Sequence, residues 1–311
     1  MHFEAILKTT SFALSEGSIH ERLRRNPTIE FDPNIAHASL IYDDESAAIL
    51  EQVHREYLDI GQHHGVPMFA LTDTWRANQE RVQQSRFHYW DVNQDNARFL
   101  ARLCNSYGLA AHPIFIGGQV GPRGDAYRPE EALTRTEAET FHASQIKSLV
   151  EGQVDFLYAS TLPALSEAQG IAAAMAISGL PYLLSFVVRQ DGALLDGTPL
   201  EHAIDVLDLT NPNPPTGYGI NCVHPKVFMS ALNTLNKSHL QRVLSFQTNT
   251  SARDPWELDE LTELETEDPN TLADLMMEAF LEFGTMFMGG CCGTDTPHIE
   301  SLARKHSELV M

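Results

Sequence analysis

Short apolar runs alternate with longer segments of helical character along almost the whole chain, and this alternation limits the possible folds more than any other feature. Each run is apolar on both faces, which is typical of a buried parallel strand. The pattern therefore indicates repeated strand and helix units around a parallel sheet. Eight such runs begin at Phe12, Met68, His112, Val154, Tyr182, Tyr218, Val243 and Met286.

Several of the segments between these runs have apolar residues at three- and four-residue spacing, which predicts amphipathic helices. Thr136 with Glu139, and Ser166 before Glu167, have the residue types of helix starts. The acidic stretch from Glu265 to Asn270 is expected to form a solvated loop. The predicted helices cover Ser46–Gln62, Gln94–Tyr107, Thr136–Leu149, Ser166–Ser178 and Leu272–Phe283.

Eight strand and helix units in 311 residues predict an α/β fold of the (β/α)8 TIM barrel type, formed as a single domain over residues 1–311. A doubly wound open sheet is the alternative. It usually has fewer strands, and no Gly-x-Gly-x-x-Gly follows the first apolar run. In a barrel, the carboxyl ends of the strands carry the catalytic residues, so these ends are where functional side chains are expected.

The charge balance excludes several classes of partner. The chain has 42 acidic and 21 basic residues, a formal net charge of -21, which would repel nucleic-acid backbones and anionic lipid surfaces. No stretch approaches the roughly 20 apolar residues of a membrane-spanning helix, and the first residues lack the features of a signal peptide. We therefore expect a cytoplasmic protein with small-molecule partners. The sequence does not indicate an oligomeric state.

Three of the four cysteines lie at predicted strand ends. Cys222 ends the sixth apolar run, and Cys291 and Cys292 end the eighth, so their sulfur atoms can converge above the mouth of a closed barrel. Three thiolates with one open coordination position are typical of a catalytic zinc site. The glycines on both sides of the adjacent pair relax the backbone enough to turn both sulfurs toward one ion.

Two other interpretations of the cysteines stay open at this point. Buried cysteine is common in protein cores, and this reading applies best to Cys104, which lies within a predicted helix. A disulfide between the adjacent Cys291 and Cys292 is a further alternative. It is disfavoured in a reducing compartment.

The stretches GINCVHP, from Gly219, and MGGCCGTDTPHIESLA, from Met288, closely resemble the homocysteine S-methyltransferase family. The resemblance is weaker but continues over most of the chain, and the stretch from Leu184 to Ile204 is more similar to a bacterial branch. It implies a (β/α)8 barrel in which Cys222, Cys291 and Cys292 bind Zn2+.

The resemblance also implies an activity. The bound zinc would deprotonate the thiol of homocysteine, and the thiolate would take a methyl group from a small activated donor to give methionine. The chain has no room for separate cobalamin and folate domains, so S-methylmethionine or S-adenosylmethionine is the favoured donor. No catalytic residue beyond the zinc-bound substrate thiolate is implied.

The substrate contacts depart from the family pattern at three positions. Glu16-Gly17 stands where the family usually has Asp-Gly, and Ser160 replaces a glutamate that is thought to hold the amino group of homocysteine. Asp73 replaces an asparagine and could restore the negative charge from a neighbouring strand. Asn221, next to Cys222, is a further candidate for contact with the substrate.

Because Ser160 removes a charge, two alternatives remain. The same zinc chemistry could act on another small thiol or selenol, or the barrel could bind zinc without catalysis. Further candidate site residues are two histidines near predicted strand ends, a histidine that opens the predicted helix after the second cysteine motif, and aromatic residues that could face a cationic donor. They are His112, His224, His298, Trp75, Tyr89 and Trp90.

Overall fold

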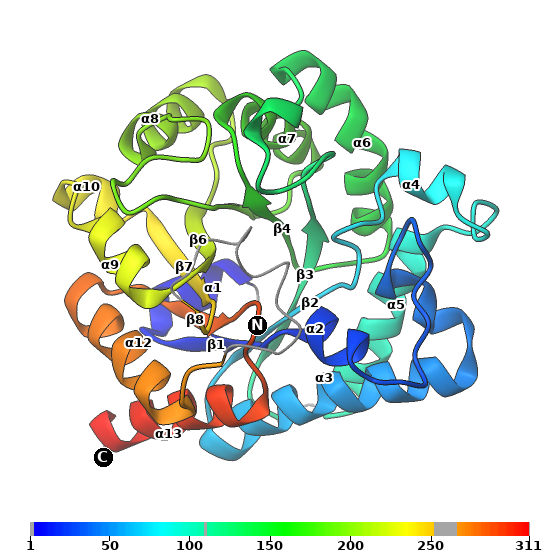
Figure 1. Cartoon of the computed structure of the whole chain (residues 1–311), viewed down its shortest axis with the longest axis horizontal. Helices are drawn as coiled ribbons and strands as arrows, with labels where there is room; N and C mark the ends of the chain where they lie inside the picture. Colours follow the sequence, from blue (N-terminus) through cyan, green and yellow to red (C-terminus); the bar gives the residue numbers. More distant parts are fainter. Residues whose placement is uncertain (1–2, 109–110, 252–265, 311) are drawn as a thin grey trace.

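The computed structural model describes residues 3–108, 111–251 and 266–310. Eight parallel strands form a closed barrel in which each strand pairs with its neighbours in chain order (Figure 1). The barrel closes between β1 and β8, where Leu14 is in register with Met288. The strands are β1 (Ala13–Ser15), β2 (Met68–Leu71), β3 (Ile114–Val120), β4 (Phe156–Leu162), β5 (Tyr182–Phe186), β6 (Gly217–Val223), β7 (Val243–Thr248) and β8 (Phe287–Gly290).

Helices surround the barrel as an outer ring (Figure 1). The long ones are α3 (Asp44–His64), α5 (Val92–Asn105), α6 (Arg135–Glu151), α7 (Leu165–Ser178), α8 (Leu200–Thr210), α9 (Pro225–Leu232), α12 (Pro269–Phe283) and α13 (Thr296–Val310). Shorter ones are α1 (Phe3–Thr9), α2 (Ile19–Arg24), η1 (His37–Tyr42), α4 (Gln79–Gln84), η2 (Pro129–Glu131) and α10 (Lys237–Leu240). Among the described residues, no helix is both long and apolar enough to cross a membrane.

The predicted (β/α)8 barrel is confirmed, and each of the eight apolar runs contains a strand. Two predicted helix starts are wrong. The reciprocal cap of α6 is formed by Thr134 and Glu137, because the chain turns into the helix two residues earlier than the Thr136 pattern indicated. Ser166 lies inside α7, whose first residue is Leu165. Of the predicted acidic loop, Glu265 lies outside the described residues.

Aromatic side chains close the amino end of the barrel. Phe3 of α1 stacks on Phe156 at a ring-centroid distance of 4.3 Å and also contacts Phe69, Phe115 and Phe287. Each of these four rings comes from the first or second residue of its strand. Burial of so much apolar surface stabilises the barrel and leaves the carboxyl end as its open face.

Polar side chains replace the aromatic layer farther along the barrel interior. The hydroxyl of Tyr158 donates to Oε1 of Gln247 at 3.0 Å, and Nε2 of Gln247 donates to Oγ of Ser15 at 3.2 Å. All three residues are buried, so these hydrogen bonds offset the cost of removing them from water. The network links β1, β4 and β7 beneath the open face.

Candidate active site

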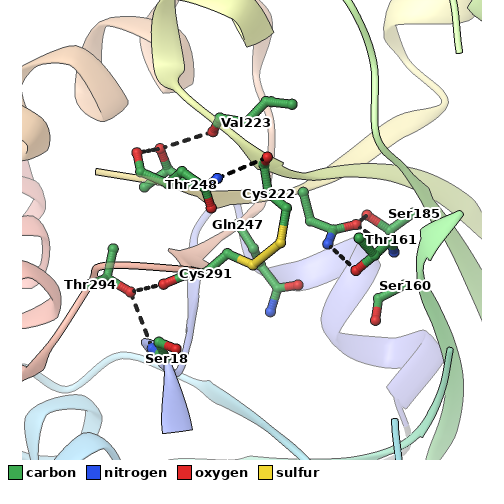
Figure 2. The surroundings of a disulfide bond; sticks show 12 residues. Ser18, Ser160, Thr161, Ser185, Cys222, Val223, Gln247, Thr248, Cys291 and Thr294 are labelled. Carbon is green, nitrogen blue, oxygen red and sulfur yellow. Dashed lines mark hydrogen bonds between the residues drawn. A yellow bond between two sulfur atoms is a disulfide. The ribbon is translucent and has the colours of Figure 1, made fainter. Parts of the chain in front are cut away.

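The three predicted ligand cysteines lie together at the carboxyl end of the barrel. Cys222 belongs to β6, and Cys291 and Cys292 directly follow β8. Their three sulfur atoms lie within 4.8 Å of one another. In this structure a disulfide joins Cys222 and Cys291, whereas the predicted alternative was a bond between the adjacent pair (Figure 2). Metal binding requires thiolates, so the same sulfurs bind a metal only when this bond is reduced.

The backbone at both strand ends is bent in ways that bring the sulfurs together. Cys222 has a φ of 55°, in the left-handed region that non-glycine residues seldom adopt. At the end of β8, a Cβ on Gly289 would lie 1.9 Å from Oγ of Ser15, so only glycine allows this strand to approach β1 so closely. Gly293 has a φ of 84° and ends the bend.

Hydrogen bonds hold the backbone carbonyls of these cysteines and leave the sulfurs at the open face. The side chain of Asn249 donates to the carbonyl of Cys222 at 3.0 Å. The hydroxyl of Thr294 donates to the carbonyl of Cys291 at 2.7 Å and accepts from the backbone N–H of Ser18 at 3.1 Å. These contacts link β1, β7 and the segment after β8, so the cysteine cluster is positioned before any ligand arrives (Figure 2).

A cavity of about 360 Å³ opens above the cysteines. All of the residues that the sequence singled out as metal ligands or substrate contacts line it. They are Glu16, Gly17, Asp73, Ser160, Asn221, Cys222, Cys291 and Cys292. Side chains from β1, β2, β4, β6 and β8 or from the loops after them thus converge at one site, as the barrel topology predicted.

Asn221 lines this cavity, but its amide is already used within the protein. Its Oδ1 accepts from the backbone N–H of Thr161 at 2.9 Å and from the hydroxyl of Ser185 at 2.6 Å, and its Nδ2 donates to Oγ1 of Thr161 at 2.8 Å. Thr161 has a φ of 62°. The amide therefore stabilises an unfavourable backbone conformation next to Ser160, whose hydroxyl accepts from Nε2 of Gln119 at 3.1 Å.

Asp73 also faces the cavity, and two histidines occupy its carboxylate. Nε2 of His54 lies 3.0 Å from one oxygen of Asp73, and Nε2 of His37 lies 3.3 Å from the other. Nδ1 of His37 is in turn 3.1 Å from Nδ1 of His20, and Nδ1 of His54 is 3.9 Å from Glu16. Asp73 and the three histidines are therefore joined by hydrogen bonds along the β1 and β2 side of the cavity, and Glu16 lies beside them at a longer distance.

The hydrogen-bonding order of this network follows from the carboxylate at its centre. An ionised Asp73 can only accept, so each histidine directs an Nε2–H toward it. The Nδ1 atoms of His37 and His20 share one hydrogen bond, whose direction depends on the tautomer of each ring.

The sequence model of the family described as homocysteine S-methyltransferase matches residues 13–306. The chain belongs to the homocysteine S-methyltransferase family. It is accordingly a methyltransferase, and the resemblance inferred from the two cysteine motifs is confirmed over nearly the whole chain.

Several known proteins are similar to this methyltransferase along their whole length. It is 23% identical to the homocysteine S-methyltransferase YbgG of Bacillus subtilis, covering 96% of this chain and 95% of that protein. It is 21% identical to the selenocysteine Se-methyltransferase of Brassica oleracea var. italica, covering 99% and 91%. The homocysteine methyltransferase MmuM of Escherichia coli matches over 97% of this chain and 98% of that one, with TM-scores of 0.76 in an oxidised form (20% identity) and 0.74 in a metallated form (19% identity).

Burial and neighbouring charges set the ionisation of the network in the methyltransferase. Burial disfavours the charged form of Asp73, but His54 and His37 outweigh this effect and hold the pKa of Asp73 below its usual value. Burial, together with His37, lowers the pKa of His20 to about 3, so this ring is neutral. Burial raises the pKa of Glu16 to about 7, although His54 and the backbone N–H of Leu71 oppose the rise.

The raised pKa of Glu16 predicts a pH-dependent contribution to stability. Its pKa rises from 4.5 to about 7 on folding, so the folded state holds this proton more tightly than the unfolded state. The contribution is fully present below pH 4.5 and is lost as pH rises through about 7. Glu16→Gln removes this titration, so the variant should gain unfolding free energy relative to the wild type as pH rises from about 5 to about 8.

Urea unfolding of the reduced, metal-free protein at several pH values measures this difference. Glu130→Gln is the matched control, because Glu130 is exposed and lies away from the cavity. A constant difference between Glu16→Gln and wild type over the whole pH range would contradict the assignment.

The other candidate site residues from the sequence differ in whether they lie at the cavity. Trp75 lines the cavity, whereas Tyr89 and Trp90 are exposed and do not line it. His112 precedes β3, at the amino end of the barrel, because the run that begins with this residue enters its strand two residues later. The predicted place for His112 near the catalytic end is therefore wrong.

Two other histidines support the walls of the barrel. Nε2 of His224 lies 2.8 Å from a carboxylate oxygen of Glu267, and Nε2 of His298 lies 3.1 Å from the carbonyl of the same residue. Neither lines the cavity. Cys104 lies in α5, where burial raises the pKa of its thiol to about 12, in keeping with the core role expected for it.

Sequence reasoning missed the histidines of the network and the residues Gln119, Arg76 and Gln247 that also line the cavity. One signal could have revealed His54. It lies on the buried face of α3 with Leu50 and Tyr57, and a buried polar side chain on an apolar helix face requires a partner. His20 lies in the short helix α2 and His37 is the first residue of η1, and neither carries a comparable signal.

Proposed function

We propose that this methyltransferase transfers a methyl group from a small sulfonium donor, S-methylmethionine or S-adenosylmethionine, to the thiolate of homocysteine and thereby forms methionine. The observation that carries the proposal is the cluster of Cys222, Cys291 and Cys292, whose sulfur atoms lie within 4.8 Å of one another at the cavity. Membership of the family supports homocysteine as the acceptor.

The donor set suits zinc. When reduced, the cluster offers three thiolates, the soft ligands that select Zn2+, and it faces a cavity from which a fourth ligand can come. Among the described residues, the cluster contains no fourth protein ligand. A bound zinc ion would supply a Lewis acid that lowers the pKa of the acceptor thiol so that the thiolate is available at neutral pH.

The chain's own residues hold the rest of the acceptor. In our proposal Glu16, which lines the cavity, accepts a hydrogen bond from the ammonium group and supplies the charge that Ser160 lacks. An ammonium group beside Glu16 would also favour its carboxylate form. A Cβ on Gly17 would lie 2.7 Å from the hydroxyl of Tyr57, so glycine at this position keeps the loop after β1 close to the barrel.

The remaining cavity surface accommodates the donor. The indole of Trp75 lines the cavity and offers an apolar surface against which the carbon chain of the donor can pack.

A second acceptor class has one specific observation in its favour. The chain aligns over 99% of its length with a selenocysteine Se-methyltransferase, and Ser160 removes the glutamate expected for homocysteine. A small selenol is therefore the alternative acceptor. The intact cysteine cluster, with room for a substrate ligand, argues against a barrel that binds zinc without catalysis.

Calorimetric titration of L-homocysteine into the reduced, zinc-loaded protein tests the proposal. Repetition in buffers of different ionisation enthalpy counts the protons released. We expect binding with the loss of about one proton, because the bound sulfur becomes a thiolate. L-Methionine is the control, since its thioether has no proton to lose.

A titration in which homocysteine does not bind distinguishes between the two proposed acceptors. If zinc-loaded protein does not bind homocysteine, the proposed acceptor is wrong, and the same titration with L-selenocysteine tests the alternative. Ser160→Glu, which restores the family residue, should then gain homocysteine binding if the missing charge is the reason.

A further inference from the structure

Arg76 is a half-buried cation at the wall of the cavity. It lies in the turn after β2, and among the described residues that line the cavity it is the only arginine or lysine. Within the parts of the chain that the structure describes, no carboxylate forms an ion pair with it. Glu21, another charged residue of the cavity wall, is already paired with Arg24 and Arg25. The guanidinium group is therefore available to an anion that enters the cavity.

The guanidinium group is also held in place. Its central carbon lies 4.6 Å from the ring centroid of Trp75, and the indole N–H of Trp75 donates to the carbonyl of Ser160 at 3.2 Å. The hydroxyl of Thr74 donates to the carbonyl of Gln119 at 2.6 Å, and the carbonyl of Thr74 accepts from Nε2 of Gln145 at 2.8 Å. The turn that carries Arg76 is thus fixed before a ligand binds, which lowers the entropic cost of recognition.

The electrostatic surroundings of Arg76 favour an anionic ligand. Burial lowers the pKa of Arg76, as does the nearby charge of Arg81, and Asp125 opposes this only in part. An arginine keeps its charge at neutral pH despite such a shift. The result is a partly desolvated cation whose hydrogen-bonding groups gain most from a planar anion that accepts two parallel N–H bonds.

We propose that Arg76 binds the α-carboxylate of an amino-acid substrate in this cavity. The inference rests on the proposed function, in which both the acceptor and the donor are amino acids, and a sulfonium or ammonium group would be repelled at this position. The cysteine cluster would then bind the sulfur, the Glu16 side of the cavity would bind the ammonium group, and Arg76 would bind the carboxylate. The carboxylate can belong to the acceptor or to the donor.

Pairs of substrates that differ only in the carboxylate distinguish these two sources. The acceptor pair is L-homocysteine and 3-aminopropane-1-thiol, and the donor pair is S-methyl-L-methionine and (3-aminopropyl)dimethylsulfonium. We would measure the dissociation constant of each compound by calorimetry, and the KM of each turned-over compound, with reduced, zinc-loaded wild type and Arg76→Met. Arg76→Lys is a second variant, which keeps the charge but loses the planar fork.

For the substrate whose carboxylate binds Arg76, Arg76→Met should weaken binding by about 10- to 100-fold, the usual range for a charge-assisted pair. Its carboxylate-free analogue should bind the variant and the wild type equally. Arg76→Lys should weaken binding of the same substrate by a smaller factor. If Arg76→Met does not fold, the comparison is made with Arg76→Lys. Arg81→Met is the matched control, because it removes a nearby charge that does not line the cavity, and it should leave both pairs unchanged.

Two outcomes would overturn the proposal. Equal losses for both members of each pair would show that Arg76 acts on the fold or on the general charge of the cavity. Unchanged binding of all four compounds would show that it recognises no substrate. If the wild type binds neither homocysteine nor S-methylmethionine, the proposed function itself fails, and the carboxylate assignment fails with it.

Discussion

Replacing Cys222 by alanine is expected to remove both zinc retention and methyl transfer. The substitution leaves two of the three clustered sulfurs, too few for a stable tetrahedral site that also binds substrate. A Lewis acid contributes several kcal/mol to such a reaction, and each 1.36 kcal/mol is a factor of ten in rate, so turnover should fall by on the order of 1000-fold or more. Zinc content after dialysis and methionine formation measure the two effects under reducing conditions.

Cys104→Ala is the matched control for this experiment. Cys104 lies in α5, away from the cavity, so its loss should change neither the zinc content nor the turnover. Because Cys222→Ala also removes the disulfide partner of Cys291, both variants must be compared in the reduced state. Full activity of Cys222→Ala would eliminate the zinc mechanism.

Glu167→Ala is expected to cause a large loss of stability. Glu167 and His142 are completely buried, and their side chains are 2.9 Å apart. The same carboxylate accepts from the backbone N–H groups of Arg123 and Leu133, at 2.8 Å and 3.4 Å. Removal of one partner from a buried pair costs about 3–5 kcal/mol, because the other group is left unpaired away from water. Urea unfolding at pH 7 gives the change in free energy.

The same substitution should also affect substrate binding. Arg123 and Leu133 lie in the segment between β3 and α6, which contributes Ala126 and Tyr127 to the cavity wall. Without the carboxylate of Glu167 this segment loses two backbone anchors. We therefore expect a higher KM for at least one substrate at temperatures where the variant is still folded.

Two further variants give the loss of stability in Glu167→Ala a scale for comparison. Glu167→Gln keeps the oxygen that accepts from Arg123 and His142, so its loss of stability should be smaller than that of Glu167→Ala. Lys147→Ala breaks an exposed pair with Glu151 and should change the unfolding free energy by less than about 0.5 kcal/mol. If Glu167→Ala were no more harmful than Lys147→Ala, the buried pair would have no stabilising role.

The barrel was predictable because its signal is repeated eight times along the chain. Strands buried on both faces need apolar residues throughout, and surface helices need apolar residues on one face, so composition alone marks the two element types. Exact helix starts were less predictable. The α6 cap uses Thr134 and Glu137, although Thr136 and Glu139 have the same residue types at the same spacing. Local sequence does not distinguish two adjacent candidates when packing decides where the helix begins.

The cysteine cluster was predictable for a different reason. Cys222 and Cys291 end different strands, and the ends of parallel strands in a closed barrel meet at one face, so topology alone places them together. The role of Asp73 was not predictable from the sequence. It faces the cavity as expected, but His37 and His54 occupy both carboxylate oxygens, and these partners come from η1 and α3.

The sequence by itself therefore determined the barrel, the family and the three sulfurs at one strand-end face, because each depends on a repeated pattern or on residues fixed by local motifs. Only the tertiary structure decided which side chains surround those sulfurs. The histidine network and the internal use of the Asn221 amide both depend on contacts between residues that lie far apart in the chain. Such contacts are set by packing geometry, which no local pattern of residue types records.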